Sequence, residues 1–277
     1  MRRALVTGAS RGIGRQTALV LAREGWDVAI TARGEGSGLV PARSRADGLV
    51  PVEGSLEQTR QDVESLGVRC LALPMDLLEL ASVLTVAEEV IAAWGGVDLL
   101  VNNAIAQFPG GHERVLGQEL AVVADTMTAN YTHQLALMQA VLPAMVAQGG
   151  GTIVNMASGS ATTDPPAPPD EGGWGLAYAA SKAAFGRIAG CVNAEYLSSG
   201  IRCFNVDPGF VVTEAIRARG GADLIEGQGF APAEPDDAGL VIAWLAGSDA
   251  ADRLLGKVLW SPLLVDKHQL RTNSGKP

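Results

Sequence analysis

The sequence is poor in the residues that bind metal ions or form disulfide frameworks. It contains only three cysteines and three histidines among 277 residues. The cysteines, Cys70, Cys191 and Cys203, are widely spaced, and neither they nor the histidines have the spacing of a metal site. We therefore expect no bound metal, buried free thiols and a reducing, cytoplasmic compartment.

The sequence also lacks a hydrophobic run long enough to cross a membrane. The longest run, 135–147, is interrupted by Gln139 and Pro143. The apolar run after the basic N-terminal residues is far too short for a signal peptide. Lysine and arginine do not cluster, and the formal net charge is −9. We therefore expect no binding to nucleic acid or to anionic membranes.

The residues that are present suit a large buried core. Hydrophobic residues make up 47% of the chain and charged residues only 18%, which argues against disorder. Short apolar runs alternate with helical segments, and most runs are apolar on both faces. This alternation predicts a single-domain, Rossmann-type, doubly wound α/β fold, with helices on both faces of a seven-stranded, mostly parallel sheet. The expected strands are 4–7, 27–31, 69–73, 98–101, 152–155, 201–206 and 257–260.

Several segments interrupt or follow this rhythm within the single domain, 1–277. Residues 34–54 and 163–175 have no periodicity, and we expect inserted loops there because strand–helix alternation resumes after each. The glycine-rich segment 210–235 is expected to be a mobile substrate lid. Residues 265–277 are expected to form a polar C-terminal tail.

Helix-end signals accompany the strands. Residues 55–58 have the sequence of a capping box in front of a helix at 59–66. Gly25 and Gly95 are expected to stop the helices that precede them.

A glycine-rich turn joins the first expected strand to the helix after it. Gly8, Gly12 and Gly14 permit a tight turn and let backbone N–H groups approach a pyrophosphate at the helix N-terminus. Such a turn alone is also compatible with an ordinary strand–helix loop. Its position at the start of the first βαβ unit favours dinucleotide binding.

The end of the second expected strand bears on the choice of dinucleotide. An NAD site usually has Asp or Glu there to hold the ribose 2′-hydroxyl, but this strand ends at Arg33 without a carboxylate. Arg33 and Arg11 could pair with a 2′-phosphate instead, or they could be solvated surface residues. The charge pattern favours NADP(H) as cofactor, with NAD(H) possible.

Tyr178 and Lys182 lie four residues apart in an expected helix, so they share one face. An ammonium group held there favours the tyrosinate and lowers a phenol pKa that starts near ~10. Such a tyrosine could give or take a proton near neutral pH. A single pair with this spacing is also common on exposed helices. Together with the glycine turn, the pair predicts hydride transfer with tyrosine as acid or base.

These motifs, in this order, resemble the short-chain dehydrogenase/reductase family in its classical form, over nearly the whole chain. The resemblance implies a catalytic group of Asn130, Ser158, Tyr178 and Lys182. In that group, Ser158 donates a hydrogen bond to the substrate oxygen. Asn130 holds a water that links Lys182 to solvent.

The resemblance also implies the residues that hold the cofactor. Residues 76–77 look like the family's adenine-contacting pair, and 102–104 resemble its Asn-Asn-Ala-Gly motif with Ile105 in place of the glycine. Residues 208–213 resemble the segment that closes over the nicotinamide. The expected cofactor-binding residues are Gly8, Ser10, Arg11, Gly12, Ile13, Gly14, Arg33, Asp76, Leu77, Asn103, Ala104, Tyr178, Lys182, Pro208, Gly209, Val211 and Thr213.

The family resemblance therefore implies an NADP(H)-dependent oxidoreductase that moves a hydride between the nicotinamide and a carbonyl or secondary alcohol. One alternative is a dinucleotide-sensing regulatory protein without catalysis. The other is an epimerase or dehydratase. No clustered charge near the lid indicates a phosphorylated substrate, so we expect a small, largely apolar carbonyl or hydroxyl compound. The resemblance also implies a homodimer or homotetramer.

Overall fold

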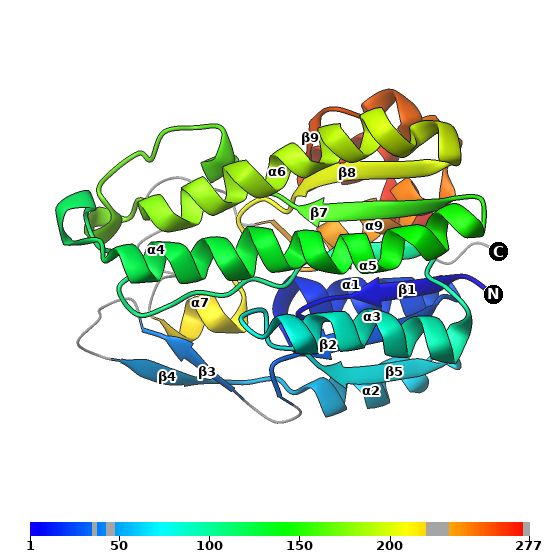
Figure 1. The fold of residues 1–277 in the computed structure, drawn as a ribbon, viewed down its shortest axis with the longest axis horizontal. Coiled ribbons are helices and arrows are strands. Elements are labelled where there is room, and N and C mark those ends of the chain that lie inside the picture. Colours follow the sequence, from blue (N-terminus) through cyan, green and yellow to red (C-terminus); the bar gives the residue numbers. More distant parts are fainter. Residues whose placement is uncertain (35–37, 43–47, 220–232, 274–277) are drawn as a thin grey trace.

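The computed structural model describes residues 1–34, 38–42, 48–219 and 233–273. Its centre is a seven-stranded sheet in the order β5-β2-β1-β6-β7-β8-β9 (Figure 1). Every neighbouring pair is parallel. All seven predicted strands are confirmed, with ends that agree to within one residue. The strands are β1 Arg3–Val6, β2 Asp27–Ala32, β5 Cys70–Pro74, β6 Leu99–Asn102, β7 Gly151–Met156, β8 Ile201–Asp207 and β9 Val258–Trp260.

The strand order creates a crevice next to β1. The chain runs outward from β1 to β2 and β5, and then returns to β6 on the other side of β1. The connections after β1 and β6 therefore leave the sheet in opposite directions. A ligand crevice forms outside the carboxyl ends of the strands at such a point.

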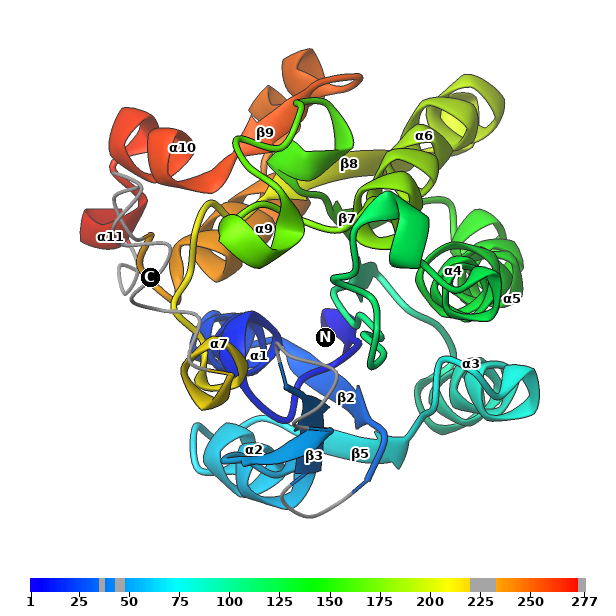
Figure 2. The same ribbon diagram turned by 90° about the vertical axis from the view of Figure 1, so that its left-hand side faces the viewer.

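Helices cover both faces of the sheet, as predicted (Figure 2). One face is packed by α1 Gly12–Arg23, α2 Leu56–Glu64, α9 Asp237–Gly247 and α10 Ser261–His268, and the other by α3 Leu80–Trp94, α5 His133–Ala147 and α6 Leu176–Tyr196. Each face has its own hydrophobic cluster. The remaining helical segments are η2 Val115–Gly117, α4 Leu120–Met127, the π-helical turn η3 Thr128–Thr132, η4 Gly159–Ala161, η5 Pro169–Glu171, η6 Leu197–Ser199, α7 Glu214–Ala218, η7 Asp249–Leu254 and α11 Leu270–Asn273.

The predicted cap at Ser55 and the predicted stop at Gly95 are confirmed, although the helix expected at 59–66 is Leu56–Glu64. The Ser55 hydroxyl caps α2 by accepting a hydrogen bond from the backbone N–H of Gln58 at 3.0 Å. Gly95 ends α3 in the left-handed conformation, with φ of 77°. Glycine has no Cβ, so it adopts this conformation at little cost in free energy.

The predicted loop at 34–54 is in part an antiparallel hairpin, so this prediction was wrong in detail. Strands β3 Gly38–Pro41 and β4 Leu49–Val52 pair with Val40 opposite Val50. Val40 and Val52 are 6% and 4% exposed, and their burial gives the hairpin an apolar face. Each strand has only four residues and contains a proline, which hides the usual strand pattern.

The predicted C-terminal tail is also not free over its described part. Helices α10 and α11 cover most of residues 265–273, and the side chains of Val265 and Leu270 are buried in the core. Of the predicted lid, the structure describes 210–219, which include α7, and 233–235; residues 220–232 lie outside the described residues.

In the described part of the chain, no helix is long and apolar enough to span a bilayer. The same residues contain no cluster of side chains that could hold a metal ion. All three cysteines are free, and Cys203 is buried. The expectation of three buried thiols was wrong for Cys191, whose side chain lies on the exposed side of α6, and Cys70 is only half-buried.

Phe185 tests how α6 is held against the sheet. Replacing Phe185 with Ala is expected to lower the free energy of unfolding by about 3–5 kcal/mol, because this side chain is fully buried between α6 and the sheet. The matched control, Leu176→Ala, removes a half-exposed side chain of the same helix and should cost less than about 1 kcal/mol. Urea unfolding followed by circular dichroism measures both values. Equal losses in the two variants would contradict this packing.

Candidate functional site

A cleft of about 470 Å³ lies at the carboxyl ends of the strands, in the crevice beside β1. This volume is in the usual range for small-molecule sites. Every predicted site residue except Asn130 lines it. The predicted residues that meet there are Gly8, Ser10, Arg11, Gly12, Ile13, Gly14, Arg33, Asp76, Leu77, Asn103, Ala104, Ser158, Tyr178, Lys182, Pro208, Gly209, Val211 and Thr213.

The glycine turn is pressed against the loop that follows β6. Gly8 has φ of +68°, and a Cβ on it would lie 2.7 Å from Ala104 Cα. A Cβ on Gly14 would lie 2.3 Å from the carbonyl oxygen of Gly8 and 2.4 Å from Asn103 Nδ2. Neither position has room for a side chain. The turn therefore needs glycine at both positions to lie this close to the loop after β6.

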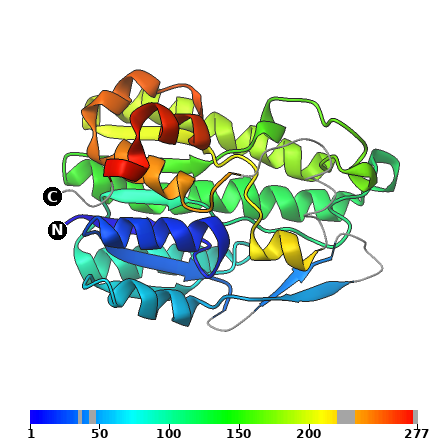
Figure 3. The same cartoon turned by 180° about the vertical axis from the view of Figure 1, so that it is seen from behind.

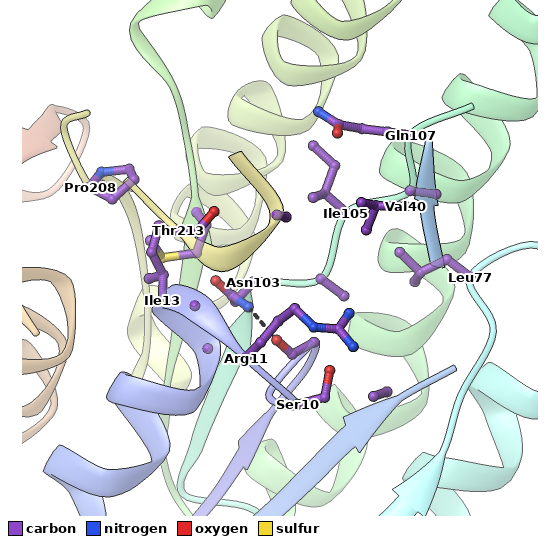
Figure 4. A pocket seen from close by; sticks show the side chains of 18 of the residues that line it. Ser10, Arg11, Ile13, Val40, Leu77, Asn103, Ile105, Gln107, Pro208 and Thr213 are labelled. Atoms are coloured by element: carbon purple, nitrogen blue, oxygen red, sulfur yellow. Dashed lines mark hydrogen bonds between the residues drawn. The ribbon is translucent and has the colours of Figure 1, made fainter. Parts of the chain in front are cut away.

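Hydrogen bonds tie the two segments together. Asn103 Nδ2 donates to the backbone oxygens of Thr7 and Gly8, at 2.8 and 3.1 Å (Figure 4). In return, the Thr7 hydroxyl accepts from the backbone N–H groups of Asn103 and Ala104, at 3.0 and 2.9 Å. These bonds fix the position of the α1 N-terminus relative to β6.

The N-terminus of α1 is held by a carboxylate. The backbone N–H of Gly12 donates to Glu214 Oε2 at 3.0 Å. Glu214 begins α7, and the preceding Thr213 packs on the same turn, since a Cβ at Gly12 would lie 3.2 Å from Thr213 Cγ2. Helix N-termini bind phosphate groups through such free N–H groups. The turn therefore fits a dinucleotide pyrophosphate, and Glu214 now makes the contact that a phosphate would make.

Two arginines line the cleft beside the hairpin. Arg11 donates from Nε and Nη2 to the backbone oxygens of Glu53 and Gly54, at 2.8 and 3.0 Å. Arg33 donates from Nη2 to the oxygen of Leu39 at 3.1 Å. Burial lowers the pKa of Arg11; a nearby carboxylate opposes this shift, and the positive charge of Arg33 adds to it. Two positive charges in one corner of the cleft favour an anion there.

The wall beside these arginines is apolar. Val40 from the hairpin, Leu77 and Ile105 lie on the same side of the cleft (Figure 4). Asp76, next to Leu77, accepts from the backbone N–H of Leu78 at 2.9 Å, which fixes the turn after β5. A flat apolar wall of this kind suits a nucleobase. Ile105, which departs from the family motif, forms part of this wall.

The other end of the cleft holds the predicted catalytic group. Tyr178 and Lys182 come from α6, and Ser158 follows β7 directly. Lys182 is buried, and its Nζ donates to the backbone oxygen of Met156 at 2.6 Å. The Ser160 hydroxyl lies 3.0 Å from that of Ser158, which keeps the Ser158 side chain in place.

The electrostatics of this end differ from the prediction. Desolvation raises the pKa of Tyr178, and hydrogen bonding to nearby serine hydroxyls only partly offsets it. Desolvation also lowers the pKa of Lys182 to about 8, against the charge of Asp207. The expected lowering of the Tyr178 pKa by Lys182 was therefore wrong for this structure. The lysine ammonium is bonded to a backbone carbonyl, and desolvation of the phenol dominates.

Asn130 lies behind the cleft wall. It is 1% exposed, and its amide exchanges two hydrogen bonds with the backbone of Ala106, at 2.8 and 2.9 Å. The π-helical turn Thr128–Thr132 carries it. In this position, Asn130 holds the loop after β6 in place.

Among the residues that line or border the cleft and that the motifs do not reveal are Val40, Gln107, Asp207, Glu214 and Arg219. Asp207 and Glu214 directly adjoin the predicted nicotinamide segment, and that adjacency is the only signal for them. The other three lie in segments without a motif.

Comparison with known proteins identifies the family of the chain. The family model of short chain dehydrogenases matches residues 2–48 and 49–222. A probable short-chain type dehydrogenase/reductase of Bradyrhizobium diazoefficiens is 34% identical over 254 residues, 90% of this chain and 82% of that protein.

Solved structures are similar over nearly the whole chain. A short-chain type dehydrogenase/reductase from Mycobacterium marinum has a TM-score of 0.77 at 26% identity, covering 94% of this chain and 93% of its own. A 3-oxoacyl-(acyl-carrier protein) reductase from Brucella melitensis, in complex with NAD, has a TM-score of 0.75 at 27% identity, covering 94% and 95%. The chain therefore belongs to the short-chain dehydrogenase/reductase family, a family of oxidoreductases.

Proposed function

We propose that this protein is an NADP(H)-dependent oxidoreductase that transfers a hydride between the nicotinamide and a carbonyl or secondary alcohol. The observation that carries the proposal is that Ser158, Tyr178 and Lys182 line the same cleft as the glycine turn. A bound nicotinamide cofactor would supply the hydride, and the protein would supply orientation and charge.

Tyr178 is the proposed general acid and base. Its raised pKa keeps the phenol protonated near neutral pH, so it can donate a proton to a carbonyl oxygen during reduction. In the reverse direction the phenolate accepts the proton of the alcohol. Ser158 donates a hydrogen bond to the same oxygen and stabilises the charge that develops on it.

Lys182 and Asn130 support this chemistry in the proposal. With a pKa of about 8, Lys182 is largely charged at neutral pH and can bind ribose hydroxyls near the phenol. We infer from the family resemblance that Asn130 holds a water that relays protons between Lys182 and solvent. Its bonds to Ala106 keep the backbone of that region in place.

The charges beside the hairpin support NADP(H) over NAD(H). Arg11 and Arg33 line the cleft beside the hairpin, and each has N–H groups beyond those bonded to the backbone that could bind a 2′-phosphate. The NAD bound to the Brucella reductase makes NAD(H) the alternative.

We also infer a homodimer or homotetramer that acts on a small molecule in the cytoplasm. The oligomer rests on the family resemblance and on the small residues of α6. Ala180 and Ala183 lie exposed on that helix, where small side chains permit close packing between copies.

Replacing Tyr178 with Phe tests the proposed chemistry. Loss of the general acid should lower kcat by about 10²- to 10⁴-fold, while the Kd for NADPH stays within about twofold. The matched control is Tyr196→Phe, at the end of the same helix, which should leave kcat unchanged. Steady-state reduction of a panel of ketones, with fluorescence titration of NADPH, measures both. A fully active Tyr178→Phe enzyme would refute the mechanism, and NADPH binding without turnover of any carbonyl or alcohol would favour a sensor.

The cofactor preference is tested at Arg33, which is the more exposed of the two arginines. Arg33→Gln should weaken NADPH binding by about tenfold or more, because a charged hydrogen bond to the 2′-phosphate is lost. NADH binding should not change. Arg23→Gln, at the exposed far end of α1, controls for net charge. Wild-type protein that prefers NADH would overturn this role for the arginines and leave the oxidoreductase in place.

Glu214 is expected to weaken cofactor binding, because its carboxylate occupies the α1 N-terminus that the pyrophosphate needs. Glu214→Gln keeps the size of the side chain but removes the charge. It should tighten the Kd of both NADPH and NADH by about two- to tenfold. Glu89→Gln, on the exposed side of α3, is the charge control. Weaker binding in Glu214→Gln would show that the carboxylate assists the cofactor.

A further inference from the structure

The cleft contains a positive charge for which the described residues supply no counterion. Arg219 follows α7 and lines the same cleft as Ser158 and Tyr178. Its Nη1 donates to the neutral amide oxygen Oε1 of Gln107. Its Nε is closed off from solvent and has no hydrogen-bond partner. No carboxylate of the described residues forms an ion pair with it.

This arrangement differs from that of seven other arginines of the chain. These form ion pairs with carboxylates, as the described residues show: Arg3, Arg15, Arg60, Arg69, Arg114, Arg202 and Arg271. Burial lowers the pKa of Arg219 to about 10, which still leaves it charged at neutral pH. An enclosed charge without a partner is unfavourable. Because this charge faces a ligand cleft, a ligand can supply the missing partner.

Gln107 holds Arg219 in place and gives it no charge partner. Gln107 directly follows Ala106, whose backbone is bonded on both sides to the Asn130 amide. The amide of Gln107 can therefore orient the guanidinium from a fixed backbone position. Phe108 and Ile216 also line the cleft. Their apolar side chains do not compete with Arg219 for an anion.

The position of Gln107 separates this charge from the pair of arginines described above. Gln107 lies at the end of the cleft away from Ser10 and Arg11 (Figure 4). A 2′-phosphate bound by Arg11 and Arg33 would therefore leave Arg219 without a partner. The anionic groups that could still pair with Arg219 are an acidic group of the substrate and the pyrophosphate of the cofactor.

We propose that Arg219, oriented by Gln107, binds a carboxylate or phosphate group of a ligand in this cleft, and that the substrate is an oxo acid or hydroxy acid. The identity of the substrate rests on the function proposed above. This inference replaces the largely apolar substrate expected from the sequence. The cofactor pyrophosphate presents the same chemistry to Arg219, so the test separates the two sources.

The anion site is tested first without any turnover. Inorganic phosphate, added to wild-type protein at constant ionic strength, should raise Tm more than it does in Arg219→Gln. Arg217→Gln, an exposed residue of α7, is the matched control and should respond like wild type. Gln107→Glu should abolish the Arg219-dependent part of the response, since it places a carboxylate beside the guanidinium. Without phosphate, Arg219→Gln should have a Tm no lower than wild type, whereas a purely structural arginine would lower it.

Two further measurements identify the source of the anion. For the substrate, kcat/KM is compared for acetoacetate and its ethyl ester, and for pyruvate and its ethyl ester. Arg219→Gln should lower the acid-to-ester ratio by about ten- to a hundredfold, and Arg219→Lys should restore part of it. For the cofactor, the Kd of NADPH and the Kd of NADH are measured in Arg219→Gln. A rise of similar size in both, with an unchanged acid-to-ester ratio, would assign Arg219 to the pyrophosphate and overturn the oxo-acid assignment.

The failures of the two proposals are distinguishable. Equal phosphate responses in wild type and Arg219→Gln, together with unchanged Kd and acid-to-ester values, would overturn the anion site while leaving the oxidoreductase intact. Wild-type protein that binds neither NADPH nor NADH would overturn the proposed function, and the phosphate response would still decide whether Arg219 binds an anion.

Discussion

The close approach of the first turn to the loop after β6 is the constraint on which the site depends. At Gly14 a side chain would meet the Gly8 carbonyl oxygen at 2.3 Å, so the turn exists in this form only because the Cβ is missing. Asn103 then bonds the turn to the loop. The same loop continues to Ala106, which Asn130 clamps from behind. A chain of short contacts thus runs from the glycine-turn end of the cleft to the position of Gln107.

The two faces of the sheet support different ends of this cleft. The cluster that includes α1 and α9 holds the glycine turn, and the cluster on the other face holds α6 through Phe185. Tyr178 and Lys182 therefore stand on a long helix docked against the sheet, where little reorganisation is possible. The parts that cross the open side of the cleft are less regular. Helix α7 has only five residues and contacts β4 of the hairpin (Figure 3).

The sequence was informative wherever a local pattern has a direct physical cause. Apolar runs such as residues 4–7 predict buried parallel strands, and the glycine spacing and the Tyr178–Lys182 spacing predict most of the cleft. The hairpin was missed because four-residue strands with prolines give no clear alternation. The tail was missed because Val265 ends an apolar run of only three residues and Leu270 stands alone among polar residues, and the burial of both depends on distant partners. The raised pKa of Tyr178 and the pairing of Gln107 with Arg219 depend on contacts between distant segments, which no local pattern encodes.

The contact between Glu214 and the backbone N–H of Gly12 links ligand affinity to a conformational equilibrium. A pyrophosphate at this N-terminus would require the carboxylate to leave α1, so a state with α7 withdrawn would be the competent one. The apparent dissociation constant then equals the intrinsic one divided by the fraction of molecules with α7 withdrawn. A bound substrate that attracts Arg219, at the end of α7, would change the fraction of molecules with α7 withdrawn. The two ligands of this cleft would then bind with a thermodynamic coupling set by one short helix.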